Sequence, residues 1–100
     1  FKLFYLSIVF TLISCSGSKD NTTLIAEAQS HIEKVQYPEA VIKLKNVLQN
    51  DATNGQARFL LGKIYIALDN YASAEKELEK ALQLDGAQQE TLLLLAKAQL

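Results

Sequence analysis

Residues 55–88 read GQARFLLGKIYIALDNYASAEKELEKALQLDGAQ, and this stretch decides the fold because it contains two helical patterns separated by a turn. Within residues 55–68 the apolar side chains follow the i, i+3, i+4 spacing of a buried helix. Asp69 and Asn70 interrupt that pattern, since short polar side chains compete for backbone hydrogen bonds. Residues 71–84 resume the helical spacing with a charged outer face. The stretch therefore predicts two helices joined by a short turn.

The same pattern occurs one unit earlier in the chain. When residues 21–54 are placed over residues 55–88, an offset of 34 residues, identical residues coincide mainly at apolar positions and in the turns. The identical pairs are Ile32 and Ile66, Tyr37 and Tyr71, Ala40 and Ala74, Leu44 and Leu78, Leu48 and Leu82, Gln49 and Gln83, and Asp51 and Asp85. This first unit predicts a helix capped by Thr22 or Thr23 and a second helix with Pro38 in its first turn. A third unit starts near residue 89.

These units resemble the tetratricopeptide repeat. The residues that carry the resemblance are Leu61, Gly62, Tyr65, Tyr71, Ala74, Leu78 and Ala81 in the second unit, Leu24, Ala28, Tyr37, Ala40, Leu44 and Val47 in the first, and Leu92, Leu95 and Ala96 in the third. The resemblance implies an all-α fold, a tetratricopeptide-repeat α-solenoid of antiparallel helix pairs, with units at about 22–54, 55–88 and an incomplete 89–100. Gly62 and Ala74 are expected where two helices approach closely. The alternative is a plain helical bundle without stacked units.

The first unit departs from the pattern of the second. Glu27 stands where the second unit has Leu61, and His31 stands where it has Tyr65. A terminal unit needs a wetter outer face, so we expect the first unit to cap the solenoid. The family's proline between units is replaced by Ala52 and Gly86.

The N-terminus predicts a targeting segment rather than part of the fold. Residues 1–14 read FKLFYLSIVFTLIS, in which Lys2 precedes an apolar run over residues 3–13. A membrane-spanning helix needs about 20 apolar residues, so this run indicates a signal peptide. Leu12-Ile13-Ser14-Cys15 resembles the lipobox of bacterial lipoproteins, which implies that Cys15 is lipidated and becomes the first residue of the mature chain. Residues 15–21 would then form a flexible tether.

The resemblance to bacterial lipoproteins also implies a location. Ser16 rather than aspartate follows Cys15, and in such lipoproteins this favours the outer membrane, with the protein lipid-anchored and facing the periplasm. Two other interpretations of Cys15 stay open. It could be a small buried or chance thiol, or the N-terminal segment could be an uncleaved signal anchor.

The composition excludes several classes of function. Ten Lys and Arg against eleven Asp and Glu give a net charge of −1, which argues against a nucleic-acid partner. One cysteine excludes an intramolecular disulfide and a cysteine-cage metal site. His31 is the single histidine and the only candidate general base, and we expect it to face the core. The sequence therefore predicts no catalytic residue, no metal, no cofactor and no enzyme activity.

Binding is the function that the resemblance implies. In stacked repeats the first helix of each unit builds a concave wall, which would hold a protein or peptide ligand. The corresponding positions are Thr22, Ile25, Gln29 and Ile32, then Gln56, Phe59, Lys63 and Ile66, then Glu90, Leu93 and Lys97. The lysine and asparagine clamp that some repeats use for terminal carboxylates is not visible, because Leu60 occupies the asparagine position. The alternative is that these residues only pack against neighbouring units.

The amino-acid sequences of the repeats resemble one group within this family in particular. Residues 37–51 (YPEAVIKLKNVLQND) and 55–85, taken together with the lipobox, resemble the tetratricopeptide lipoproteins of the PEP-CTERM protein-sorting and exopolysaccharide system. This implies a periplasmic scaffold for export or polysaccharide assembly. Two alternatives stay open: a lipoprotein of outer-membrane or pilus assembly, and a docking domain of an enzyme that continues past residue 100. The helix expected near residues 92–100 is apolar on all sides, so we expect further repeats to follow it.

Overall fold

The computed structural model describes residues 19–84 and 88–100, and these residues form five helices without a strand. The helices are α2 (Asn21–Glu33), α3 (Tyr37–Asn50), α4 (Gly55–Ala67), α5 (Tyr71–Gln83) and α6 (Gln88–Gln99). The predicted all-α class is therefore confirmed. The predicted signal peptide over residues 1–14, the lipidation site Cys15 and the turn at Gly86 lie outside the described residues.

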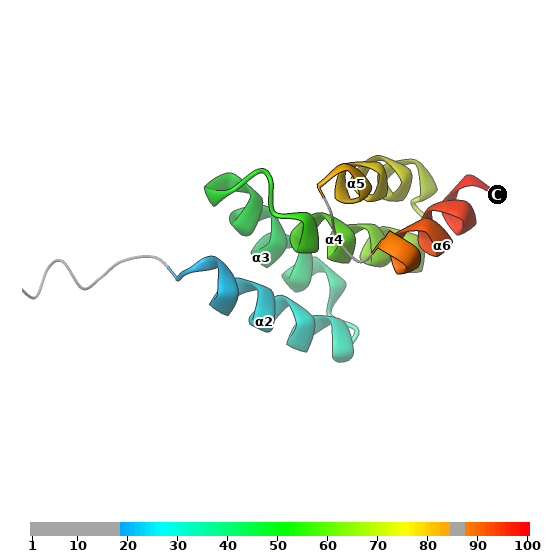
Figure 1. The fold of residues 1–100 in the computed structure, drawn as a ribbon. Helices are drawn as coiled ribbons and strands as arrows, with labels where there is room; N and C mark the ends of the chain where they lie inside the picture. The colour runs from blue at the N-terminus through cyan, green and yellow to red at the C-terminus, as the bar shows by residue number, and fades with distance from the viewer. Residues whose placement is uncertain (1–18, 85–87) are drawn as a thin grey trace, which may run out of the picture.

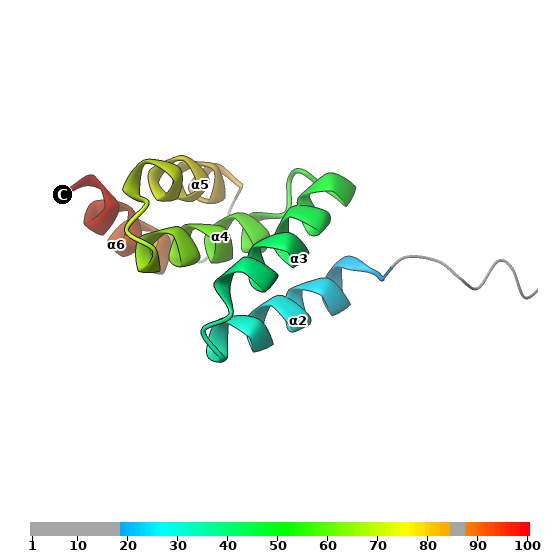
Figure 2. The same ribbon diagram turned by 180° about the vertical axis from the view of Figure 1, so that it is seen from behind.

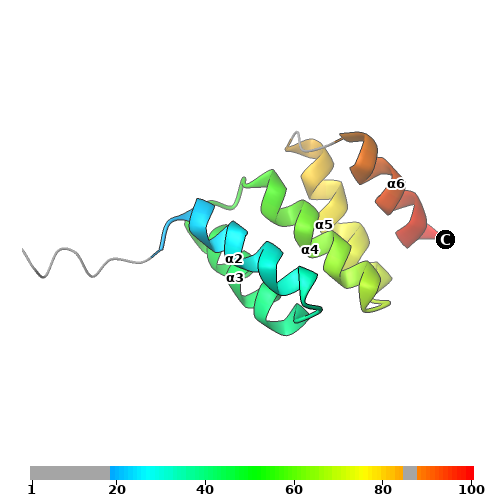
Figure 3. The ribbon, with the colours of Figure 1, turned by 90° about the horizontal axis from the view of Figure 1, so that it is seen from below.

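The helices pack in chain order. Each helix contacts the next one along the chain, and α4 also contacts α6. In Figure 1, α3 lies above α2 and α5 above α4, so the second helix of each pair belongs to one layer and the first helix to the other. Figure 2 shows the same two layers from behind. Figure 3 shows α2, α4 and α6 following one another, which is the arrangement of a solenoid of helix pairs.

Polar side chains fix where three of the helices begin. Asp20 caps α2 by accepting a 2.8 Å hydrogen bond from the backbone N–H of Thr23. The predicted cap at Thr22 or Thr23 was wrong, because the carboxylate of Asp20 can accept this bond and also interacts favourably with the positive end of the helix dipole. Asn54 caps α4, and Asn70 caps α5. Helix α3 has Pro38 in its first turn, as predicted.

The α2–α3 and α4–α5 turns share one backbone conformation. Val35 has φ = 60° and Asp69 has φ = 59°, and these positions are one 34-residue period apart. Aspartate tolerates this left-handed region, whereas a β-branched residue there is a strained outlier. Helix α4 therefore ends at Ala67, close to the predicted interruption at Asp69.

Replacing Val35 by glycine is expected to stabilise the protein by about 1 kcal/mol. The substitution removes about 1–2 kcal/mol of left-handed strain, and the greater freedom of glycine in the unfolded chain offsets part of this gain. Few contacts are lost because the Val35 side chain is 67% exposed. Urea denaturation checks the result, and Val35→Asn serves as a second variant because asparagine tolerates this conformation. A lower unfolding free energy in both variants would contradict the assignment of strain.

The core runs between the two layers and is apolar. Leu44, Leu61, Ile64 and Leu78 are fully buried within it. At Gly62, α4 and α5 approach so closely that an added Cβ would lie only 2.3 Å from Cδ2 of Leu78. This confirms the prediction that Gly62 stands where α4 and α5 need a small residue.

One mostly buried ion pair also joins α4 and α5. Nη1 of Arg58 lies 2.9 Å from Oε1 of Glu77, and the two side chains are only 15% and 14% exposed. Nη2 of Arg58 donates a 3.3 Å hydrogen bond to the carbonyl of Ala52 in the preceding turn. The first unit has Leu24 and Lys43 at the positions equivalent to Arg58 and Glu77, so this pair distinguishes the second unit.

Helix α6 packs against α5 and α4 but leaves apolar side chains in solvent. Thr91 and Ala98 are buried, whereas Leu92, Leu93 and Leu100 are exposed. Leu92 occupies the position of Arg58 in α4, which faces the second helix of its own unit. The exposed side of α6 that carries Leu92 therefore corresponds to the side of α4 that α5 covers.

Candidate ligand-binding groove

Two open hollows lie between α2 and α4, each with a volume of about 320 Å³. The first hollow is lined by Asn21, Thr22, Ile25, Ala26, Gln29, Asn54 and Gln56. The second hollow is lined by Gln29, Ile32, Glu33, Leu60 and Lys63. Because Gln29 belongs to both, we treat the two hollows as one feature and name it the α2–α4 groove.

The first hollow has no charged side chain in its lining. Four of its residues carry side-chain amides, namely Asn21, Gln29, Asn54 and Gln56, and the largely buried Ile25 adds an apolar side chain to the lining. Asn54 is held by its role as the cap of α4, in which its Oδ1 accepts a 2.9 Å hydrogen bond from the N–H of Ala57. Such a lining suits a ligand that carries hydrogen-bonding groups without a net charge.

The second hollow carries one charge of each sign, from Glu33 and Lys63. The ammonium of Lys63 lies 5.6 Å from the centroid of the Phe59 ring, within the range of a cation–π interaction. This contact places the lysine over an aromatic ring of its own helix. Ile32 and Leu60 provide the apolar part of the lining.

The comparisons with known proteins agree with this architecture. A family model described as tetratricopeptide repeat matches residues 31–98. The chain belongs to the tetratricopeptide repeat family. The matched range reaches from the end of α2 through α6, and such repeats generally bind protein partners as scaffolds. A comparison with curated proteins found no match.

The tetratricopeptide arrangement brings most of the predicted groove residues of the first two units together. Ile25, Gln29 and Gln56 line the first hollow together with Thr22, and Ile32 and Lys63 line the second. Phe59 and Ile66 are largely buried instead of lining either hollow. Leu93, Lys97 and Glu90 lie exposed on α6, outside both hollows. A role of these residues in ligand binding stays a prediction.

Sequence reasoning missed several residues that line the α2–α4 groove. Ala26 and Leu60 occupy equivalent positions one 34-residue period apart, and both line it. Leu60 could have been predicted to line the groove, because it occupies the position that an asparagine has in the carboxylate clamp of other repeats. Asn54 was missed because it precedes the helix, and Asn21 and Glu33 because they lie at the two ends of α2.

His31 differs from its prediction. It is half-buried rather than facing the core, and its Nδ1 lies 2.8 Å from Oε1 of Gln36 in the α2–α3 turn. Over residues 19–84 and 88–100, no group of three or more His, Cys, Asp or Glu side chains could hold a metal ion. Among the helices that the structure describes, none combines the length and the hydropathy needed to cross a bilayer.

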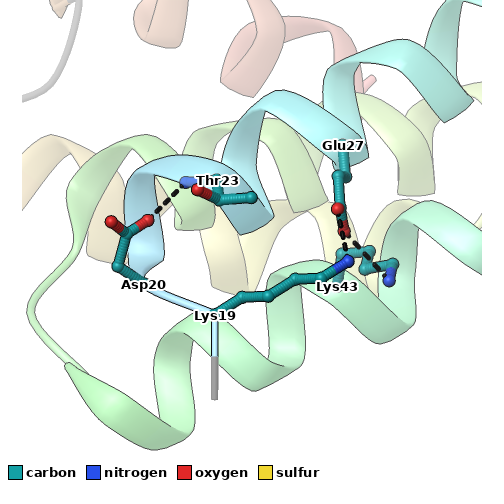
Figure 4. A network of polar contacts seen from close by, with 5 residues as sticks. All are labelled: Lys19, Asp20, Thr23, Glu27 and Lys43. Carbon is teal, nitrogen blue, oxygen red and sulfur yellow. Dashed lines mark hydrogen bonds and ion pairs between the residues drawn. The ribbon is translucent and has the colours of Figure 1, made fainter. Parts of the chain in front are cut away.

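Glu27 of the first repeat lies in a network of charged side chains. Glu27 lies between two lysines, forming ion pairs with Lys19 and with Lys43, the latter at 3.0 Å (Figure 4). Hydrogen bonds from these ammonium groups, Lys19 first, hold the pKa of Glu27 below its usual 4.5. The equivalent residue of the second repeat, Leu61, is fully buried. A charge network on α2 and α3 thus replaces an apolar contact.

The stabilising effect of Glu27 is expected to disappear in acid. Because the folded-state pKa is lowered, the contribution is complete above the unfolded-state pKa near 4.5 and is lost as the pH falls through the folded value. We therefore expect Glu27→Gln to lower the unfolding free energy at neutral pH and to have little effect at the acid end. Urea denaturation across the pH range measures the difference. Glu79→Gln, an exposed change on α5, is the control, and a pH-independent effect of Glu27→Gln would contradict the prediction.

Proposed function

We propose that this chain is a lipid-anchored protein-interaction scaffold on the periplasmic side of a bacterial outer membrane. The observation that carries the proposal is the α2–α4 groove, an open surface built from the first helices of two adjacent tetratricopeptide repeats. Its lining mixes amide, apolar and charged side chains, which can contact both the main chain and the side chains of a polypeptide ligand. The partner would bind in this groove.

The sequence around Cys15 supports the anchor. A lipobox-like stretch, Leu12-Ile13-Ser14-Cys15, follows a short apolar run, and α2 begins at Asn21 after its cap at Asp20. Residues 15–20 span at most about 20 Å when fully extended. A lipid on Cys15 would therefore keep the first hollow, which includes Asn21, close to the bilayer surface.

The resemblance of residues 37–51 and 55–85 to PEP-CTERM-associated repeats supports a cellular role. On this basis the scaffold would assist PEP-CTERM protein sorting and export or exopolysaccharide assembly. Deleting the gene in its host is expected to reduce surface display of sorted proteins or polysaccharide. Re-expression of the protein with an unchanged groove should restore this surface display. Full surface display in the deletion strain would contradict this role.

Replacement of Cys15 tests the anchor. In fractionated cells we expect the unchanged protein in the membrane fraction, with a lipid-modified N-terminal residue detectable by mass spectrometry. Cys15→Ser is expected to abolish the lipid and to prevent lipoprotein-type cleavage. Ser18→Ala, a change in the same proposed tether, is the matched control. The anchor would be overturned if the Cys15→Ser and Ser18→Ala proteins both had a normally cleaved signal peptide and both stayed in the membrane fraction without a lipid.

Site-specific photo-crosslinking tests the binding surface. A photoreactive amino acid at Gln29, which lines both hollows, is expected to capture a protein partner in living cells. The same amino acid at Glu79, exposed on α5 and absent from both linings, is the control. Equal capture at both positions, or capture only at Glu79, would contradict binding in the α2–α4 groove.

A further inference from the structure

We propose that Asn54 and Gly55 form a site of spontaneous deamidation whose rate is controlled by the helix cap of α4. Asparagine deamidates when the backbone nitrogen of the following residue attacks the side-chain carbonyl carbon. A following glycine has no Cβ, so it hinders this attack least and leaves the main chain most free to rotate. Of the five asparagines in the chain, only Asn54 is followed by glycine. The inference depends neither on a binding partner nor on a lipid anchor.

The reaction needs water and no other reactant. The Gly55 nitrogen loses its proton and forms a bond to Cγ of Asn54, and the side-chain amide group leaves as ammonia. The product is a five-membered cyclic imide. Water then adds to one of the two carbonyl carbons of the ring and breaks its bond to nitrogen. One ring opening gives aspartate, and the other gives isoaspartate, whose main chain runs through the former side chain.

The position of Gly55 in α4 favours the attacking nitrogen. Gly55 is the first residue of this helix, and the first N–H groups of a helix have no acceptor within it. The helix dipole also places partial positive charge at this end, which favours loss of the proton. Because the nitrogen reacts in its deprotonated form, we expect the rate of deamidation to rise with pH.

The native cap keeps the two reacting atoms apart. Oδ1 of Asn54 accepts a 2.9 Å hydrogen bond from the N–H of Ala57, which holds the side chain against the first turn of α4. The main chain of Asn54 is extended, with ψ at 99°. Ring closure requires Cβ of Asn54 and the Gly55 nitrogen to eclipse each other about the Cα–C bond, and at this ψ they are far from eclipsed. The cap must therefore open locally before the ring can close, so folding slows the reaction.

Deamidation changes the joint between the two repeats and the lining of the first hollow. Asn54 stands in the turn between α3 and α4 and lines that hollow, which contains no charged side chain. Aspartate retains the cap of α4 but brings a negative charge into the lining. Isoaspartate adds one carbon to the main chain and displaces the capping oxygen, so this product should unfold at a lower urea concentration. The aged protein would thus contain forms that differ in charge and in stability.

Incubation in water labelled with heavy oxygen tests the site. The full chain is purified in detergent, incubated at neutral pH, digested and analysed by mass spectrometry. We expect aspartate and isoaspartate at position 54, each with one labelled oxygen. Asn70 is the internal control, since it caps α5 through a 3.3 Å bond from the N–H of Ser73 but is followed by Tyr71. Asn54 should react at least about tenfold faster than Asn70.

Two comparisons complete the test. Gly55→Ala should slow the reaction at least about tenfold without unfolding the protein, because the added Cβ meets Leu84 at an ordinary 3.4 Å. The unchanged protein should react faster when it is unfolded in urea. The site would be overturned if Asn54 reacted no faster than Asn70, or if Gly55→Ala left the rate unchanged. Equal rates in the folded and the urea-unfolded chain would overturn the control by the cap.

Discussion

Replacing Gly62 by alanine is expected to lower the unfolding free energy by about 1–2 kcal/mol, although alanine is the better helix former. The new Cβ would lie 2.3 Å from Cδ2 and 2.5 Å from Cγ of Leu78. Leu78 is fully buried, so any shift of its side chain has to be taken up within the packed core. Overpacking of this kind costs about 1–3 kcal/mol, and the gain of about 1 kcal/mol in helix propensity offsets only part of a large clash.

Gly55→Ala is the matched control for this prediction. At Gly55 the nearest atom to an added Cβ is Cβ of Leu84 at 3.4 Å, an ordinary contact, so the change should be neutral or slightly stabilising. A double-mutant cycle with Leu78→Ala identifies the contact. In the Leu78→Ala background, Gly62→Ala should cost nothing, because the clashing atoms are gone. An equal cost in both backgrounds would show that the penalty has another origin.

Removing the carboxylate of Glu77 is the other change with a large expected effect. Glu77→Ala leaves the mostly buried guanidinium of Arg58 without its partner across the α4–α5 interface. Breaking such a pair from one side costs about 3–5 kcal/mol, which is enough to unfold much of a small domain. Urea denaturation monitored by circular dichroism at low temperature measures the loss. Glu79→Ala, an exposed change two residues away, should have an effect below about 0.5 kcal/mol.

The double variant Arg58→Leu with Glu77→Leu tests whether charge itself is needed. Leucine already occupies the equivalent of Arg58 in the other two units, at Leu24 and Leu92. We expect the double variant to be about as stable as the unchanged protein or more stable, since apolar residues can replace a buried pair without loss. A double variant as unstable as Glu77→Ala would show that the pair contributes more than its desolvation costs.

The helix pairs could be predicted because their determinants repeat. The 34-residue offset aligned the apolar positions, and Gly62 was identified as a point of close approach from its residue type and place in the unit. The cap of α2 was misplaced because Asp20, Thr22 and Thr23 are all good capping residues within a few positions. Only the backbone conformation at the start of the helix, extended at Asp20, chooses among them.

The left-handed turn and the groove lining were harder to predict. The left-handed φ of Val35 is imposed by the packing of α2 on α3, since valine by itself avoids that conformation. The wall positions were predicted from the first helices alone, so Asn54, which enters the groove from the turn before α4, was outside the pattern. Residues brought to a site by a turn leave no periodic signal.

The ion pair between Arg58 and Glu77 affects how helices of similar repeats pair correctly during folding. At the place equivalent to Glu77, α3 carries Lys43, a charge that would repel the guanidinium. Helix α4 therefore cannot exchange α5 for α3, in the same molecule or in another copy, without burying two like charges. The opposite charges of Glu77 and Lys43 thus distinguish α5, the correct partner of α4, from the equivalent helix α3. This difference disfavours domain-swapped or out-of-order pairing in a chain of similar repeats.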